Sequence, residues 1–207
     1  MNGIGYKKGQ KMKNIELKSL TVITGNSFTG KTALLREILK EANGNSKYVN
    51  IDSRIDIKID KDFKHWFKFI FDIDFEAERR VSFVQKILSA GLSCKEGELL
   101  VVENPEIGLH PKAASRIAKF LVYLVSQRGV RVVLETNSTD IVTSICYEVY
   151  VSNIYSEKVL FLNKADKDNT EKVFVDGYGK FCNENKELVK YPSGFFDANT
   201  KELYALL

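Results

Sequence analysis

The chain has 207 residues, of which 44% are hydrophobic and 28% are charged. This length supports one sizeable core, or one domain with a small appendage. The net charge is +4, from 31 basic and 27 acidic side chains. Residues 1–20 hold the whole excess, with five lysines and one glutamate. The balanced remainder excludes a globally basic nucleic-acid binder and leaves nucleic acid only a weakly supported partner.

Three further classes are excluded by composition. No apolar stretch approaches the roughly 18 residues that a membrane span needs, and residues 1–20 lack the apolar region of a secretory signal. The three cysteines are widely spaced, and two histidines alone cannot build a histidine-based metal site. We therefore expect a cytoplasmic protein with no membrane partner, no disulfide framework and no zinc site.

The first half of the chain alternates apolar strands with helices. Residues 1–12 carry three glycines and three lysines and are expected to form a basic arm, ahead of a single domain at 13–207. Apolar and alternating runs predict strands at 20–24, 47–52 and 55–60. A helix is expected over 31–41, ending near Gly44. Residues 61–95 form a short helical subregion, with apolar side chains at helical spacing over 63–70 and about 76–93.

The second half continues the alternation of strands and helices and then turns to consecutive short strands. Strands are predicted at 99–102 and 130–134, and helices from Pro111 to about 127, over 139–146 and over 199–206. Three short strands, at 148–152, 159–163 and 172–176, lie between polar turns. The expected fold class is therefore α/β, with a mostly parallel central sheet, flanking helices and antiparallel edge strands.

The segment between the first strand and the first helix fits the phosphate-binding pattern G-x-x-x-x-G-K-[ST]. Glycines at both ends let backbone N–H groups turn toward phosphates, and the following helix adds its positive N-terminus. Lys31 is expected to reach the β- and γ-phosphates of ATP, and the Thr32 hydroxyl to bind Mg²⁺. The residues of this Walker A motif are Gly25, Asn26, Ser27, Phe28, Thr29, Gly30, Lys31 and Thr32.

Two later strands end in polar residues that would lie near that loop. The apolar run LLVV at 99–102 is followed by Glu103, which makes this glutamate the candidate Walker B residue and a second contact to Mg²⁺. The run VVL at 132–134 leads into ETNS, whose tip is placed to sense a γ-phosphate. Glu103, Asn104, Glu106 and Asn137 are therefore candidate catalytic residues beside Lys31.

Together these segments resemble compact bacterial ABC-class ATPases of the RecF, SMC and OLD-nuclease kind, as found in phage-defence modules. The resemblance rests on NIELKSLTVITGNSFTGKT at 14–32, ENPEIGLHP at 103–111, ETNS at 135–138 and YPSGFFD at 191–197. It covers essentially the whole chain from about residue 14. It implies a P-loop ATPase head without coiled-coil arms, because only 49 residues separate Thr32 from Ser82.

The resemblance also implies partners. It predicts a head-to-tail homodimer, or a higher oligomer, with ATP between the subunits and a separate effector such as a nuclease or a toxin. Arg80-Val81-Ser82-Phe83 is the candidate signature segment, in which Ser82 would touch the γ-phosphate in trans. His110 lies in the loop that crosses the dimer in such proteins, although a packing histidine is an equal alternative.

The sequence departs from the family pattern at four places. Asn104 stands where the family usually has a second carboxylate. Its amide can orient a water molecule but cannot accept a proton. Glu106 is the candidate to supply the missing carboxylate. Asn137 replaces the switch histidine, and Arg80 replaces the signature glycine. No glutamine falls at the Q-loop, where residues 50–53 would substitute.

These departures leave alternatives open. The leading hypothesis is a slow ATP-driven switch that controls a separate effector. The alternative is a nucleotide-binding scaffold without useful hydrolysis, favoured by Asn104, Asn137 and Arg80. A small-molecule P-loop kinase is a third reading, but the motifs at 103–111, 135–138 and 191–197 have no role in it.

Overall fold

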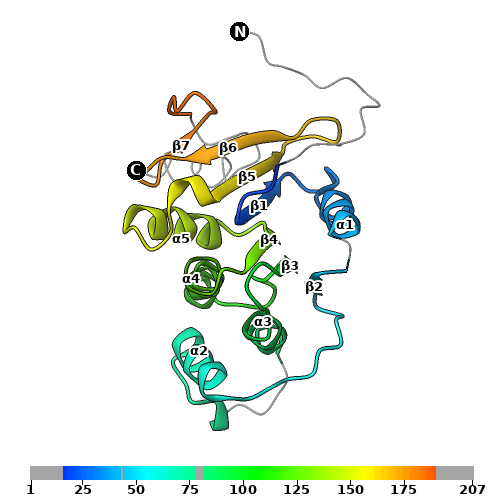
Figure 1. Cartoon of the computed structure of the whole chain (residues 1–207), viewed down its shortest axis with the longest axis vertical. Coiled ribbons are helices and arrows are strands. Elements are labelled where there is room, and N and C mark those ends of the chain that lie inside the picture. Colours follow the sequence, from blue (N-terminus) through cyan, green and yellow to red (C-terminus); the bar gives the residue numbers. More distant parts are fainter. Residues whose placement is uncertain (1–15, 43, 78–81, 190–207) are drawn as a thin grey trace, which may run out of the picture.

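The computed structural model describes residues 16–42, 44–77 and 82–189. Within these ranges the strands form one seven-stranded sheet with the order β2-β3-β4-β1-β5-β6-β7 (Figure 1). The strands are β1 (Leu20–Gly25), β2 (Ser46–Val49), β3 (Leu99–Glu103), β4 (Arg131–Glu135), β5 (Val159–Lys164), β6 (Glu171–Val175) and β7 (Phe181–Cys182). The first five are mutually parallel, whereas β6 and β7 are antiparallel additions at one edge. The predicted α/β class is confirmed.

Helices cover both faces of this sheet (Figure 1). They are α1 (Lys31–Glu41), α2 (Lys61–Phe71), α3 (Phe83–Leu92), α4 (Pro111–Arg128) and α5 (Thr139–Tyr150), with short 3-10 turns at Phe75–Ala77 and Ser156–Lys158. α1 packs on one face through Leu34, Leu35 and Ile38. The larger core on the other face includes residues of α2, α3, α4 and α5.

Side-chain alternation along the central strands decides which residues face α1. Val101 of β3 and Val133 of β4 belong to the α1 core, whereas their neighbours Val102 and Leu134 belong to the opposite core. Successive side chains of a strand point to opposite faces. The last residues of β3 and β4 therefore lie on the α1 face, at the carboxyl ends of their strands.

Local sequence signals explain most element boundaries. Pro111 occupies the first turn of α4, and Gly129 ends that helix with a φ of 64°. Asp60 Oδ1 accepts a hydrogen bond from the Phe63 N–H at 2.9 Å and caps α2. Ser82 and Gln85 form a capping box at the start of α3.

Two predicted strands are wrong. The segment 148–152 belongs largely to α5, because Ile141, Ile145 and Val149 repeat every four residues and pack into the larger core. The segment 55–60 alternates in burial but pairs with no strand of the described residues. Its Ile55 and Ile57 pack on the core, while the Lys58 N–H donates to Ser89 Oγ of α3 at 3.1 Å.

Other boundaries moved by a few residues. β2 ends at Val49 rather than at 52, and α3 begins at Phe83 rather than near 76. The short strand β7 lies where no strand was predicted. The basic arm at 1–12, the YPSGFFD segment and the helix expected over 199–206 lie outside the described residues.

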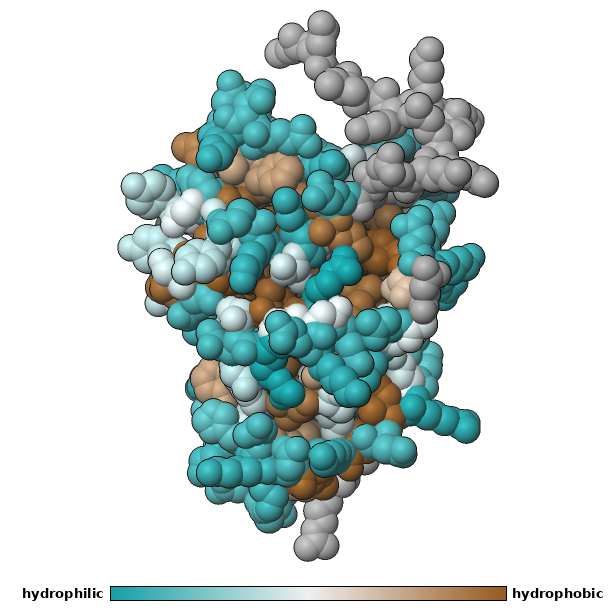
Figure 2. All heavy atoms as spheres, viewed as in Figure 1, coloured by the Kyte–Doolittle hydropathy of each residue, from teal (hydrophilic) through white to brown (hydrophobic). Residues whose placement is uncertain are grey.

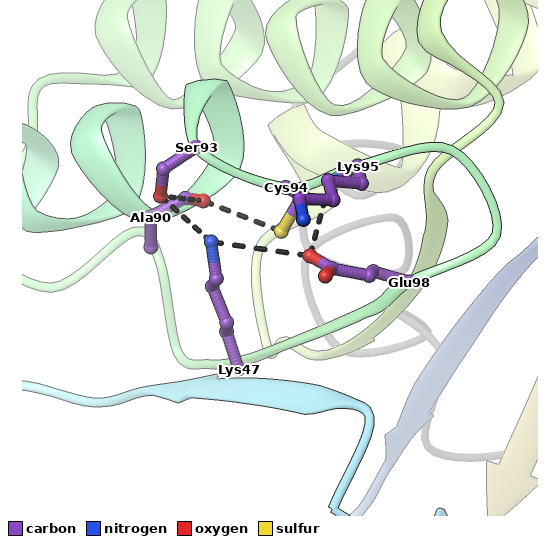
Figure 3. A network of polar contacts seen from close by, with 6 residues as sticks. All are labelled: Lys47, Ala90, Ser93, Cys94, Lys95 and Glu98. Carbon is purple, nitrogen blue, oxygen red and sulfur yellow. Dashed lines mark hydrogen bonds and ion pairs between the residues drawn. The ribbon is translucent and has the colours of Figure 1, made fainter.

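A polar network ties β2 to the α3–β3 connection (Figure 3). Lys47 Nζ of β2 donates to Ser93 Oγ at 2.8 Å and lies 4.0 Å from Glu98 Oε2. The same carboxylate accepts the Lys95 N–H at 3.0 Å. These bonds help fix the start of β3, whose opposite end carries Glu103.

The surface in view is mostly hydrophilic, with apolar side chains exposed between the polar ones (Figure 2). Among the described helices, none combines the length and the hydropathy that crossing a membrane requires.

Candidate nucleotide-binding site

The connection between β1 and α1 lies at the carboxyl edge of the parallel sheet. β1 pairs with β4 on one side and with β5 on the other, although all three are far apart in sequence. The chain leaves β1 through α1 toward β2 at one edge of the sheet, whereas it leaves the neighbouring strand β4 through α5 toward β5 on the other side of β1. The connections that follow β1 and β4 therefore run in opposite directions along the sheet. Ligands of open α/β sheets bind in the crevice outside the carboxyl ends of strands at such a switch point.

The loop over residues 25–30 is fastened to the end of β5. The Asn26 N–H donates to the Lys164 carbonyl at 3.2 Å, and Asn26 Nδ2 donates to the Ala165 carbonyl at 2.9 Å. Within the loop, Thr29 Oγ1 donates to the Asn26 carbonyl at 2.9 Å. Gly25 and Gly30 have φ angles of 126° and 90°. Both conformations favour glycine, and they curve the backbone as the Walker A pattern requires.

Lys31, the first residue of α1, lies across this loop. Its Nζ donates to the carbonyls of Gly25 and Asn26 at 2.9 and 2.6 Å. Burial lowers the pKa of Lys31, while the nearby carboxylates Glu135 and Glu106 act to raise it. The lysine therefore places a buried ammonium group at the centre of the predicted phosphate site.

The N-terminus of α1 differs from those of the other described α-helices. Asp60, Ser82, His110 and Ser138 each accept a backbone N–H through a side chain at the starts of α2, α3, α4 and α5. Gly30 at the start of α1 offers no such cap, and the first turn of α1 holds no acidic residue. The first N–H groups of α1 are thus available to an anionic ligand.

Two carboxylates stand side by side opposite the start of α1. Glu103 and Glu135 are register partners at the ends of β3 and β4. Glu135 is buried, and its Oε2 and Oε1 accept the Thr32 hydroxyl at 3.0 and 3.2 Å. Burial is the main cause that raises the pKa of Glu135, with Glu103 and Glu106 adding to it. The acid that contacts the Walker A threonine is thus Glu135.

The other carboxylate, Glu103, is held by an aromatic hydroxyl. The Tyr48 hydroxyl of β2 hydrogen-bonds to Glu103 Oε2, and Asn50 Nδ2 donates to that hydroxyl at 3.2 Å. Burial and the Glu103 contact raise the pKa of Tyr48 to about 12. Ser53 Oγ donates to Asn50 Oδ1 at 2.8 Å. The segment expected to replace the Q-loop glutamine is therefore linked to Glu103 through Tyr48.

Glu106 connects the loop after β3 with the loop after β4. Its Oε2 accepts the Thr136 hydroxyl at 2.9 Å, and its Oε1 accepts the Asn137 N–H at 2.7 Å. Asn137 Nδ2 donates to Asn104 Oδ1 at 3.3 Å. Asn104 has a φ of 48°, a left-handed conformation that asparagine tolerates well. The structure thus brings together three predicted residues, Asn104, Glu106 and Asn137.

Ser82 and His110 make local hydrogen bonds. Ser82 Oγ accepts the Gln85 N–H at 3.4 Å, and His110 Nδ1 accepts the Lys112 N–H at 3.3 Å. His110 is exposed, which does not fit the packing alternative. Arg80 and Val81 of the candidate signature lie outside the described residues.

The loop carries a strained and exposed aromatic residue. Phe28 has a φ of 62°, and 93% of its surface is exposed. We expect Phe28→Gly to stabilise the fold by roughly 0.5–1 kcal/mol, because relief of about 1–2 kcal/mol of left-handed strain exceeds the entropy that glycine adds to the unfolded chain. Urea denaturation measures this change. Phe28→Ala is the control, since it removes the ring and keeps the strain. If Phe28→Gly and Phe28→Ala have equal free energies of unfolding, the backbone at residue 28 is not strained.

Two side chains at this site were not predicted from the sequence. The sequence places Glu135 at the start of ETNS and Tyr48 within a predicted strand, and neither position by itself indicates a site residue. Once the strand order is known, the alternation of side chains along each strand places both on the α1 face. Tyr48 packs on the α1 core, and Glu135 follows Val133 of that core by two residues.

A second hollow lies elsewhere on the molecule. It has a volume of about 470 Å³ and lies between α5 and the segment 178–189, with Tyr147, Tyr150 and Leu188 among its lining residues. None of the predicted site residues lines it.

Comparison with known proteins points to nucleotide-binding relatives. A family model described as "AAA domain, putative AbiEii toxin, Type IV TA system" matches residues 81–142, which include Glu103 and Glu135. The energy-coupling factor transporter ATP-binding protein EcfA of Methanocaldococcus jannaschii is 32% identical over 93 residues, or 44% of this chain and 30% of that protein. EcfA2 of Clostridium perfringens is 34% identical over 73 residues, or 34% of this chain and 26% of that protein.

The chain therefore spans less than a third of the length of these curated relatives. Among solved structures, cbiO1 from Clostridium perfringens, part of the ABC transporter complex cbiONQ, is similar with a TM-score of 0.46. Its identity to this chain is 15%, over 74% of this chain and 76% of that one.

Proposed function

We propose that the protein binds ATP at the loop 25–32 and hydrolyses it. One observation carries this proposal. The uncapped N-terminus of α1 presents Lys31 and Thr32 directly opposite the carboxylate of Glu135. A helix N-terminus with a buried lysine suits a polyphosphate, and a hydroxyl facing a carboxylate suits its metal ion. The ATP-binding role in the names of EcfA and EcfA2 supports the same ligand.

The donor set fits Mg²⁺. Thr32 supplies a hydroxyl oxygen at the start of α1, and the end of β3 supplies the carboxylate of Glu103. Protein sites for this ion commonly use one or two carboxylates together with substrate phosphates. When bound, the ion would neutralise charge on the β- and γ-phosphates.

We propose that hydrolysis is slow. Asn104 has an amide where a proton acceptor is needed, and that amide bonds to Asn137. Both carboxylate oxygens of Glu106 already accept hydrogen bonds, from Thr136 and Asn137. The residues nearest to the expected γ-phosphate therefore bind to one another rather than presenting a free base.

We propose that two chains close head to tail on ATP, with Ser82 of each chain facing the γ-phosphate bound by the other. Ser82 is the N-cap of α3, so its hydroxyl lies at the positive end of that helix. His110 begins α4 and is exposed, so it is available to a partner chain.

We further propose that dimer closure controls a separate effector, such as a nuclease or a toxin in anti-phage defence. The description of the matched family model, which names a toxin and a toxin–antitoxin system, supports this class of partner. A cytoplasmic setting suits the proposal, since Cys94, Cys146 and Cys182 are free thiols. Co-expression with the product of the adjacent gene, followed by purification with and without ATP, tests the partnership.

Light scattering of the full chain with ATP and Mg²⁺ tests dimer closure. We expect the wild-type chain to double its mass, and Ser82→Asp to remain a monomer, because aspartate still caps α3 but repels phosphate. The loss of affinity should be about tenfold or more. Ser82→Asn is the matched control, since asparagine caps as well without charge. A Ser82→Asp chain that dimerises like wild type would contradict the closed arrangement.

A second candidate function is a nucleotide-binding scaffold without useful hydrolysis. The Asn104–Asn137 bond is the observation that favours it. Measuring the release of phosphate from ATP distinguishes the slow switch from the scaffold. Slow turnover supports the switch, whereas saturable ATP binding with no turnover, even beside a partner, supports the scaffold.

A further inference from the structure

The sequence lacks the second carboxylate that would follow Glu103 along the chain. Residue 104 is an asparagine, and both Glu106 oxygens are occupied by the loop after β4. The structure nevertheless holds a second carboxylate beside Glu103. Glu135 is its register partner on the neighbouring strand β4.

The position of Glu135 is specific in three respects. Glu135 is 3% exposed, so the carboxylate is withdrawn from bulk water. Both of its oxygens lie within hydrogen-bond distance of the Thr32 hydroxyl. The buried ammonium of Lys31 is close enough to interact with it electrostatically.

This placement costs stability unless it serves a ligand. A carboxylate taken out of water is unfavourable, and a single hydroxyl donor compensates only part of the loss. Lys31 gives its hydrogen bonds to the Gly25 and Asn26 carbonyls, so it does not neutralise Glu135 through a direct bond. A divalent cation between Thr32 and Glu135 would supply the missing positive charge.

We propose that Glu135 supplies the second carboxylate of the nucleotide site, as a ligand of the Mg²⁺ that Thr32 also holds. The carboxylate pair thus lies across two strands, Glu103 on β3 and Glu135 on β4, rather than along one strand. Tyr48 holds Glu103, which leaves Glu135 as the acid in contact with the metal-binding hydroxyl. This inference rests on the proposed function and adds a metal ligand to it.

The test is the gain in ADP affinity that Mg²⁺ produces, measured by isothermal titration in Mg²⁺ and in EDTA. We expect the wild-type chain to bind ADP more tightly in Mg²⁺, and Glu135→Gln to lose about tenfold or more of that gain. Its affinity in EDTA should be unchanged or higher, since a charge that repels phosphate is gone. Mn²⁺ titration of the ADP complex, followed by electron paramagnetic resonance, should show the same loss.

Glu148→Gln is the matched control. Glu148 is also a buried glutamate, but it lies on α5, where it contacts Lys119 and Asn153. Its replacement should leave the Mg²⁺-dependent gain unchanged. Thermal unfolding without nucleotide adds a second readout, in which Glu135→Gln should unfold at a higher temperature than wild type.

The outcomes separate the two claims. If Glu135→Gln keeps the wild-type gain in ADP affinity that Mg²⁺ produces, Glu135 is not a metal ligand. If Glu135→Gln loses ADP affinity equally in Mg²⁺ and in EDTA, its role is structural and the proposal is also overturned. If the wild-type chain binds no nucleotide in either condition, the proposed function itself fails.

Discussion

Lys31→Met should reduce ATP affinity by about 10–100-fold and abolish turnover, while the fold persists. The ammonium of Lys31 is buried beside the start of α1 and bonds to the loop carbonyls at 2.6 and 2.9 Å. Bound phosphate would become its partner in place of those carbonyls. Hydrogen bonds to charged groups are worth about 1.5–3 kcal/mol each, which sets the size of the loss. Equilibrium binding and phosphate release measure the two effects.

Lys47→Met is the matched control for that variant. Lys47 is also a hydrogen-bonded lysine, but it lies on β2 and bonds to Ser93 at the end of α3 (Figure 3). Its loss should leave ATP affinity at the wild-type value. A Lys31→Met chain that binds and hydrolyses ATP normally would place the nucleotide away from this loop.

Gly25→Ala should destabilise the protein by roughly 2–5 kcal/mol and impair ATP binding. A Cβ on Gly25 would lie 2.1 Å from the Lys164 carbonyl oxygen, and the φ of 126° is one that alanine rarely adopts. Backbone strain of about 1–3 kcal/mol and a comparable overpacking cost combine at this position. Because the carbonyl belongs to β5, relief requires the loop to move away from the sheet. Urea denaturation measures the loss.

Gly44→Ala separates the clash from the strain. Gly44 has a φ of 81°, but nothing lies within 4 Å of a Cβ built on it. It should cost only about 1 kcal/mol and leave ATP binding intact. If the two alanine variants lose equal stability, the close contact between Gly25 and β5 is wrong.

Sequence periodicity anticipated most of the fold because the central elements obey local rules. The run at 20–24 and the helix over 31–41 were predicted almost to the residue, since apolar spacing and the glycines mark both ends. The strand predicted at 148–152 failed because β-branched residues also suit the buried side of a helix. Glu148 and Val149 extend the α5 stripe rather than starting a strand.

The site was only partly predictable for a different reason. Lys31 and Thr32 follow from a contiguous motif, so the sequence places them together. Glu135 and Tyr48 reach the site through strand pairing, β4 beside β1 and β2 beside β3, which no local pattern encodes. Knowledge of the strand order would have sufficed, because parity then places both side chains on the α1 face.

The most direct test of the nucleotide site is isothermal titration of this chain with ATP in the presence of Mg²⁺. We expect saturable binding of one ATP per chain, with an affinity that falls about 10–100-fold in Lys31→Met and is retained in Lys47→Met. A wild-type chain that binds no ATP, or that binds it equally well without Lys31, would contradict the assignment of the nucleotide site to residues 25–32.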